Sequence, residues 1–103
     1  MGTLRFEREV FVETVRFTED SIVVYLDDGR SVSVPLAWYP RLQGGTPKER
    51  EHFELIGDGE GIHWPELDED ISAEGIIAGR RSAESAESLQ RWLQQRSGSN
   101  EAR

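Results

Sequence analysis

The chain has 103 residues, a formal net charge of −8 at pH 7 and a mean hydropathy of −0.60. Its length corresponds to one small domain, and its 9% of aromatic residues argue against a disordered chain. With no cysteine and no apolar run of the ~20 residues that span a bilayer, the sequence excludes disulfide frameworks, thiol catalysis and cysteine-bound metals, and it predicts a soluble, cytoplasmic protein.

The charge is unevenly distributed along the chain. Residues 1–79 carry seventeen acidic and seven basic side chains, whereas residues 80–103 carry five arginines and three glutamates. A negative surface repels a phosphate backbone, so nucleic-acid binding by the main part is disfavoured and a basic protein partner is favoured. The same acidity is also explained by solubility alone, or by a high-salt cytoplasm.

The first part of the chain predicts three antiparallel strands over residues 10–34. The clearest signal is a hairpin, in which β-branched runs at 22–27 and 30–34 flank Asp28 and Gly29, because a glycine tolerates the positive φ of such turns. In the first strand we place Val10, Val12 and Thr14 on one side and Phe11, Val15 and Phe17 on the other.

After Pro35 the pattern predicts a short helix or 3₁₀ turn, followed by a helix from Thr46 to about Phe53. Thr46 can cap that helix, Pro47 suits the first helical position, and Glu49 can complete a capping box.

Residues 54–64 predict a second hairpin, with Leu55 and Ile56 opposite Ile62 and Trp64. Its glycine-rich turn at 57–61 lacks the lysine of a phosphate-binding loop and carries two acids instead.

Residues 66–70 are interpreted as an acidic loop before a helix at 72–79, for which Ser72 is the N-cap and Gly79 the end. Residues 82–96 predict a polar helix that is marginal unless it docks on the body, and we expect disorder from Ser97 onward.

The whole pattern indicates an α+β fold: a three-stranded antiparallel meander, short helices, a second hairpin and a C-terminal helix. We divide the chain into a domain at 1–81 and a polar helical tail at 82–103. The predicted core consists of Val12, Val15, Ile22, Val24, Leu26, Val32, Val34, Leu36, Trp38, Phe53, Ile62, Trp64, Ile71 and Ile76.

Three segments carry a resemblance to a known family. Residues 33–42 (SVPLAWYPRL), 53–57 (FELIG) and 61–72 (GIHWPELDEDIS) resemble the family called domain of unknown function 2442, and the similarity covers about residues 10–79. The resemblance implies a small prokaryotic α+β protein with no established activity, often encoded beside a small protein in an arrangement like a toxin–antitoxin pair. Some longer relatives carry a helix-turn-helix, for which this tail is too short.

The leading functional hypothesis is a protein-binding module, an antitoxin-like or accessory partner of a small basic protein, whose oligomeric state stays open. Its candidate contact residues combine aromatic and arginine side chains with the acidic loop, since such side chains anchor interfaces. They are Trp38, Tyr39, Arg41, Glu66, Asp68, Glu69 and Asp70. We expect Trp38 to belong mainly to the core, and Tyr39 and Arg41 to be partly exposed.

Two alternatives stay open. The first is a metal-binding protein that uses His63, Asp68 and Asp70, although acids before a helix more often stabilise its N-terminus. The second is a DNA-binding regulator that uses Arg80, Arg81, Arg91 and Arg96. We expect no cofactor and no enzyme activity, because the two histidines have no paired nucleophile in the pattern.

Overall fold

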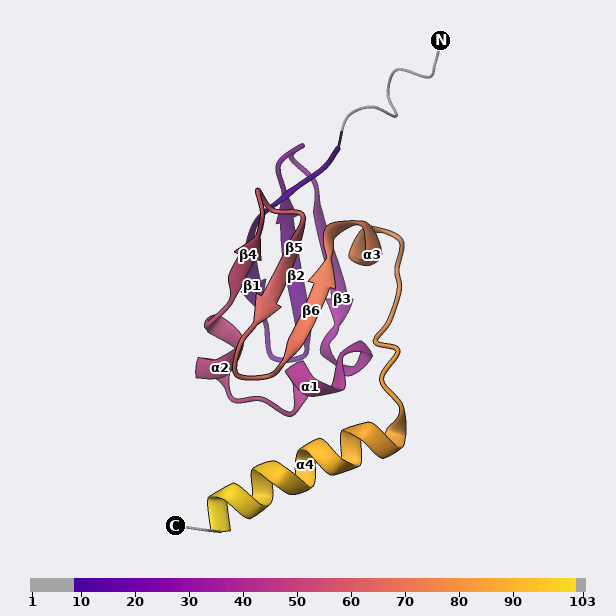
Figure 1. The fold of residues 1–103 in the computed structure, drawn as a ribbon. Coiled ribbons are helices and arrows are strands. Elements are labelled where there is room, and N and C mark those ends of the chain that lie inside the picture. The colour runs from indigo at the N-terminus through magenta and orange to yellow at the C-terminus, as the bar shows by residue number, and fades with distance from the viewer. Residues whose placement is uncertain (1–8, 102–103) are drawn as a thin grey trace.

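The computed structural model describes residues 9–101 of the chain, with side chains from 9 to 96, and it is an α+β fold (Figure 1). Its elements in chain order are β1 (Val12–Phe17), β2 (Ser21–Leu26), β3 (Ser31–Pro35), η2 (Leu36–Trp38), α1 (Pro40–Gln43), α2 (Pro47–Glu51), β4 (Glu54–Ile56), β5 (Gly61–Trp64), β6 (Glu69–Ser72), α3 (Ala73–Ile77) and α4 (Ala86–Glu101).

The first sheet is the expected antiparallel meander, in the order β1-β2-β3. Its tight turn between β2 and β3 contains Asp28, whose carboxylate accepts a hydrogen bond from the Arg30 N–H at 3.0 Å, and Gly29, which has φ +96°. The hairpin interpretation of this segment is therefore confirmed, including the positive φ that a glycine supplies.

The facing of β1 differs from the sequence interpretation. Val12 and Val15, which we placed on opposite sides, are both buried, with 2% and 6% of their surface exposed. The pairing of β1 with β2 shifts register between Val12 and Thr14, and such a β-bulge inserts one extra residue. Strict alternation therefore fails at this point, and both valines face the core.

The connection between the sheets is helical, as predicted. Pro40 begins α1, and Thr46 caps α2 by accepting a hydrogen bond from the Glu49 N–H at 3.1 Å. The Glu49 carboxylate accepts in return from the Thr46 N–H at 2.9 Å, which completes the capping box. The helix ends at Glu51 rather than near Phe53.

The second sheet has three strands, in the order β4-β5-β6, where we expected a hairpin followed by an acidic loop. Glu69 and Asp70 belong to strand β6 and pair with Trp64 and His63 of β5. Leu55 lies opposite Ile62 as predicted, but Ile56 lies opposite Gly61, so the predicted partner Trp64 was wrong. The predicted acidic loop at 66–70 is therefore a turn followed by the first residues of strand β6.

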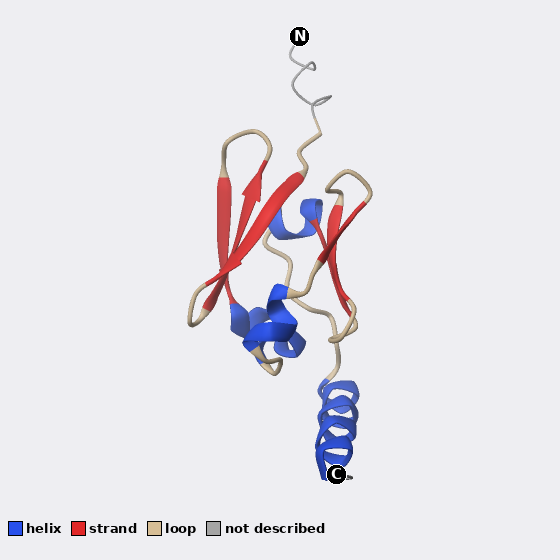
Figure 2. Ribbon diagram, turned by 90° about the vertical axis from the view of Figure 1, so that its left-hand side faces the viewer, coloured by secondary structure: helices blue, strands red, loops and turns tan. Residues whose placement is uncertain are grey.

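The two sheets form separate layers with α3 between them at one end, as Figure 2 shows. Trp64 is fully buried between the layers, with Phe17 of the first sheet and Phe53 each 6.3 Å from its ring centroid. Its indole N–H donates to the Arg50 carbonyl at 2.8 Å, so this large side chain is buried with its polar atom satisfied. The layers also meet where the Val12 N–H donates to the Gly59 carbonyl at 2.8 Å.

The predicted core is confirmed with a few differences. Val32, Trp38 and Phe53 are only partly buried at its margin. The core also includes residues that the sequence interpretation did not place there, since they lie in turns and short helices without a regular apolar period. These are Tyr39, Leu42, Leu67 and Ala73.

The two C-terminal helices are shorter or shifted relative to the prediction. Helix α3 spans Ala73–Ile77 instead of 72–79, and its predicted cap is confirmed, since the Ser72 hydroxyl accepts from the Gly75 N–H at 2.8 Å. Helix α4 begins at Ala86 instead of residue 82. It continues to Glu101, through the segment from Ser97 for which the sequence predicts disorder, and residues 102–103 lie outside the described part.

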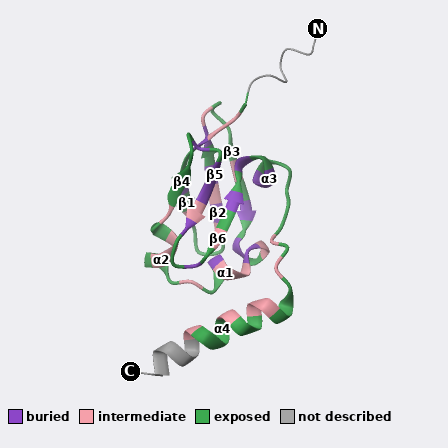
Figure 3. Cartoon of the chain, viewed as in Figure 1, coloured by how far each residue is buried: buried purple, intermediate pink, exposed green. Residues whose placement is uncertain are grey.

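No described residue of α4 is fully buried, and the apolar side chain of Leu93 is exposed. In Figure 3 its described residues carry the exposed and intermediate colours and none is buried. None of the helices in residues 9–101 combines the length and the apolar content that crossing a bilayer requires.

Candidate functional site

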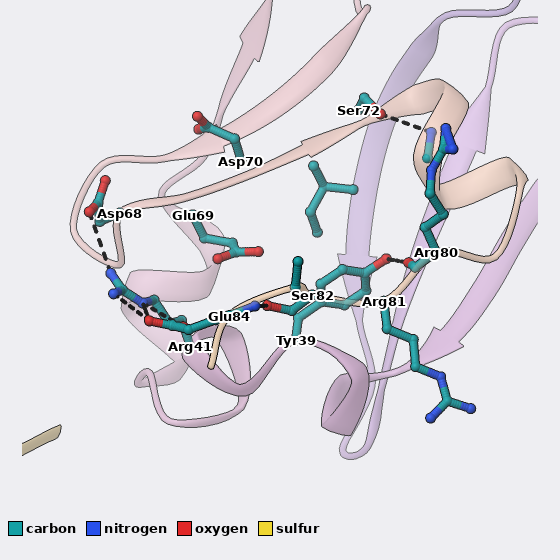
Figure 4. A pocket seen from close by; sticks show the side chains of 13 residues that line it. Tyr39, Arg41, Asp68, Glu69, Asp70, Ser72, Arg80, Arg81, Ser82 and Glu84 are labelled. Atoms are coloured by element: carbon teal, nitrogen blue, oxygen red, sulfur yellow. Dashed lines mark hydrogen bonds and ion pairs between the residues drawn. The ribbon is translucent and has the colours of Figure 1, made fainter. Parts of the chain in front are cut away.

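A pocket of about 430 Å³ lies between β6 and the extended segment 80–84 that connects α3 to α4. Tyr39 and Arg41, at the end of η2 and in α1, form its floor and one end, as Figure 4 shows. The pocket is lined mainly by charged and polar side chains, and it contains most of the residues that the sequence suggested for partner binding.

Strand alternation decides which β6 side chains point inward. Ile71 is buried in the core, and Glu69, two residues earlier, lies on the same face of the strand. Asp70 lies on the opposite, exposed face. The sheet therefore directs the Glu69 carboxylate towards Tyr39 and the segment 80–84 instead of towards solvent (Figure 4).

Tyr39 holds the far wall of the pocket in place. Only 4% of its surface is exposed, so the expectation of partial exposure was wrong. Its hydroxyl donates a hydrogen bond of 2.6 Å to the Arg80 carbonyl, and the Ser82 N–H donates to the Trp38 carbonyl at 3.1 Å. Burial, and secondarily the charge of Glu69, raises the pKa of the Tyr39 phenol, so its proton remains available for this bond.

Arg41 is fixed at one end of the pocket. Its guanidinium makes bonds of 2.6–3.0 Å to the Glu84 carboxylate and a longer contact of 3.4 Å to Asp68. The Arg41 side chain is 14% exposed, in agreement with the predicted partial exposure. The hydrogen bond lowers the pKa of Glu84 and raises that of Arg41, as expected for a charge-assisted pair.

Glu69 is the unusual ionisable group of the pocket. Burial raises the pKa of its carboxyl to about 7, the negative charge of Glu84 adds to the rise, and Arg41 opposes it. No donor among the described residues forms a hydrogen bond with this carboxyl, although Arg41 lies nearby and is engaged by Glu84. A half-buried carboxyl without a donor marks a position where a ligand can supply one.

The metal candidates do not converge. The His63 ring nitrogen Nδ1 and the Asp70 carboxylate lie 2.5 Å apart across β5 and β6, and this bond raises the pKa of the imidazole. Asp68 contacts Arg41 instead, and within the described residues no group of three His, Asp or Glu side chains is arranged to hold a metal ion. Glu66 is also separate, with its carboxylate 2.9 Å from the His52 ring.

Two of the four arginines of the DNA alternative already contact other side chains. The Arg81 guanidinium lies 4.6 Å from the centroid of the Trp38 ring, and Arg96 bonds Glu49 at 2.9 Å. Arg80 lines the pocket, whereas Arg91 is exposed on α4.

The structure thus joins five of the seven suggested contact residues in one pocket and leaves Trp38 and Glu66 outside its lining. It adds a wall that the sequence interpretation missed, residues 80–84, of which only Arg80 and Arg81 had been assigned any role. The signal that could have indicated this wall is weak, because Glu84 and Arg41 are 43 positions apart.

Comparison with known proteins now identifies the group to which the chain is related. The model of the family "Protein of unknown function (DUF2442)" matches residues 12–82, which is more than half of the chain. This chain belongs to the DUF2442 family. The resemblance suggested by residues 33–72 is thereby confirmed, and no curated protein matches the chain.

Two solved structures share the fold. The crystal structure of a protein of unknown function from Rhodospirillum rubrum has 26% sequence identity and a TM-score of 0.65, and the match covers 75% of this chain and 95% of that one. The solution structure of an uncharacterised protein from Chromobacterium violaceum has 25% identity and a TM-score of 0.63, with 86% and 81% covered.

Proposed function

We propose that this DUF2442 protein is a protein-binding module for a small basic partner, in the manner of an antitoxin or accessory subunit. The supporting observation is the charge of the second sheet and its loops. Residues 51–74 contain nine carboxylates and no lysine or arginine. Because complementary charge accelerates encounter and rejects partners of like charge, this surface fits a basic protein and repels nucleic acid.

Several of these carboxylates lie on exposed positions of the second sheet and form no ion pair with a lysine or arginine of residues 9–96. Glu54 and Asp58 are both exposed, in β4 and in the turn that follows it. The cations of the body lie elsewhere, for example Arg16 on β1 and Arg30 beside Asp28. The outer surface of the second sheet is therefore acidic and fits a basic partner.

The proposal is a binding role without catalysis. Among the described residues each histidine ring bonds a carboxylate, His52 with Glu66 and His63 with Asp70, and no serine or threonine hydroxyl is hydrogen-bonded to an imidazole. General-base activation of a nucleophile requires such a contact or a single bridging water.

Co-expression with the protein of the adjacent reading frame tests the proposal, since the family resemblance implies such a pairing. We expect a stoichiometric complex that weakens as salt rises from 0.05 to about 0.5 M, because surface charges are screened over ~10 Å at 0.1 M. The variant Glu54→Gln/Asp58→Asn should slow association, and the charge-matched variant Glu13→Gln/Glu19→Gln, in β1 and in the turn that follows it, should not. Retention of DNA with sequence preference, and no complex, would refute the module.

A further inference from the structure

The open edge of β6 offers backbone groups to the same pocket. β6 is an outer strand of the second sheet, and its lateral neighbour across the pocket is the extended segment 80–84. The Ala73 N–H donates to the Glu60 carbonyl at 2.9 Å, directly beyond the Gly61–Ser72 pair. Hydrogen-bonded and non-hydrogen-bonded pairs alternate along an antiparallel strand. The bond from Ala73 therefore determines which residues of β6 form backbone hydrogen bonds with β5.

This alternation identifies the backbone groups of β6 that point away from β5, towards the open edge of the sheet. Counting back from Ala73, Ile71 and Glu69 are the residues that bond β5, and Asp70 and Ser72 direct their N–H groups to the open edge. The Asp70 carbonyl points the same way, whereas the Ser72 carbonyl lies at the start of α3. In the described part of the chain no backbone hydrogen bond outside the ladders uses Asp70.

Side-chain chemistry selects what could pair with this edge. Glu69 lies beside the edge with no hydrogen-bond donor among the described residues, and Arg41 is held by Glu84 at the end of the pocket. Asp68 is 87% exposed at the mouth. A cationic side chain that entered beside Glu69 would supply the donor this carboxyl lacks, in a partly desolvated place where such a bond is strong.

We propose that the groove between β6 and residues 80–84 binds an extended segment of a basic protein, which pairs with the backbone of Asp70 and Ser72 and places a lysine or arginine against Glu69. The inference rests on the proposed function and names its contact. Addition of a strand to a sheet edge provides affinity through main-chain bonds, and pockets for alternate side chains provide specificity.

The test uses the full-length, ¹⁵N-labelled protein and capped five-residue peptides at pH 8. The probe has the sequence Val-Arg-Val-Arg-Val, and two comparison peptides replace both arginines by glutamate or the central valine by proline. We expect saturable changes in the amide signals of Asp70, Ser72 and residues 80–84 with the arginine peptide alone. Proline has no backbone N–H and is disfavoured inside a strand, so the proline peptide should cause no change in these amide signals.

Matched variants separate the groove from general attraction to an acidic surface. Glu69→Gln keeps the shape of the side chain and should weaken the arginine peptide about tenfold, since a bond to a charged group is worth more than 1.4 kcal/mol. Glu54→Gln removes the same charge from the outer face of the same sheet and should change the affinity less than twofold. Equal effects of the two variants, or signal changes on the outer face of the sheet, would overturn the inference.

The outcomes also separate this inference from the proposed function. If the co-expressed complex forms and its affinity is unchanged by Glu69→Gln, the module stands and the groove is wrong. If the arginine peptide binds in the groove and no basic partner forms a complex, the groove stands and the proposed function fails.

Discussion

Among the described residues, Glu69 is the one whose pKa changes most on folding. Its carboxyl has a pKa of about 7 because its position on β6 removes water and places it near Glu84. Between pH 4.5, the ordinary pKa, and about 7, the folded state binds more protons than the unfolded state. The folded state therefore loses stability as the pH rises through this interval.

Replacing the Glu69 carboxyl tests whether its ionisation destabilises the folded state. Glu69→Gln should raise the free energy of unfolding at pH 8 by on the order of 1 kcal/mol, less than the full pKa shift implies because solvent screens a partly exposed group, and should have little effect at pH 4. Urea unfolding at both pH values measures the difference, and Glu74→Gln on α3 serves as the control. A less stable Glu69→Gln protein at pH 8 would contradict this account.

The pKa of the His63 imidazole offers a second test at the scale of a single residue. Its hydrogen bond to Asp70 raises the pKa of the imidazole, so the pair stabilises the folded state below the ordinary pKa of histidine, and this contribution is lost as the pH rises through the raised value. In Asp70→Asn the His63 pKa should fall towards 6.5. NMR titration of the ring protons measures it, and an unchanged pKa would show that the carboxylate is not its cause.

At the scale of single elements, local signals decide what could be predicted. The turn at Asp28 and Gly29 and the capping box of α2 depend on residues within four positions of each other, and both were predicted correctly. Strand β6 was missed because Glu69 and Asp70 are poor strand formers, and they become a strand only through pairing with β5.

The candidate site shows the same limit. Its acidic side and Tyr39 with Arg41 were suggested as contact residues from residue type, since tyrosine and arginine are enriched where proteins bind partners. The opposite wall was not, because the bond from the Tyr39 hydroxyl to the Arg80 carbonyl joins residues 41 positions apart without any shared pattern.

Helix α4 depends on its contacts with the body, and this dependence can be measured. The Trp92 ring lies 5.0 Å from the guanidinium of Arg41 and 4.8 Å from that of Arg96. A polar helix of this length is marginal alone, so Trp92→Ala should accelerate amide exchange over residues 86–96 while the two sheets stay protected. Gln94→Ala, at an exposed position, is the control. Unaltered exchange in Trp92→Ala would show that the Trp92 ring does not hold the helix against the body.

At the scale of the whole molecule, the two layers approach each other closely at Gly59. This residue has φ +109°, and a Cβ added there would lie 2.4 Å from the Val12 carbonyl oxygen. Gly29 also has a positive φ, but nothing lies within 4 Å of its added Cβ. Comparing substitutions at the two glycines therefore separates the cost of a positive φ from the cost of a steric collision.

Alanine at these positions should have unequal effects. Gly29→Ala is expected to lower the free energy of unfolding by about 1 kcal/mol, the cost of a positive φ for a residue with a Cβ. Gly59→Ala adds a collision with backbone that cannot rotate away, and we expect a loss of about 3 kcal/mol or more. Equilibrium denaturation of both variants measures the difference, and equal losses would mean that the contact between the layers relaxes freely.

The order of the strands also has a consequence for how fast the chain folds. Each sheet is a meander of consecutive strands, β1-β2-β3 and β4-β5-β6, so every ladder joins neighbours in the chain. Folding rates fall as the sequence separation of native contacts grows, because long loops must close before such contacts form. Each meander can form from short-range contacts, which leaves docking of the two layers, across the connection from Leu36 to Phe53, as the step that sets the rate.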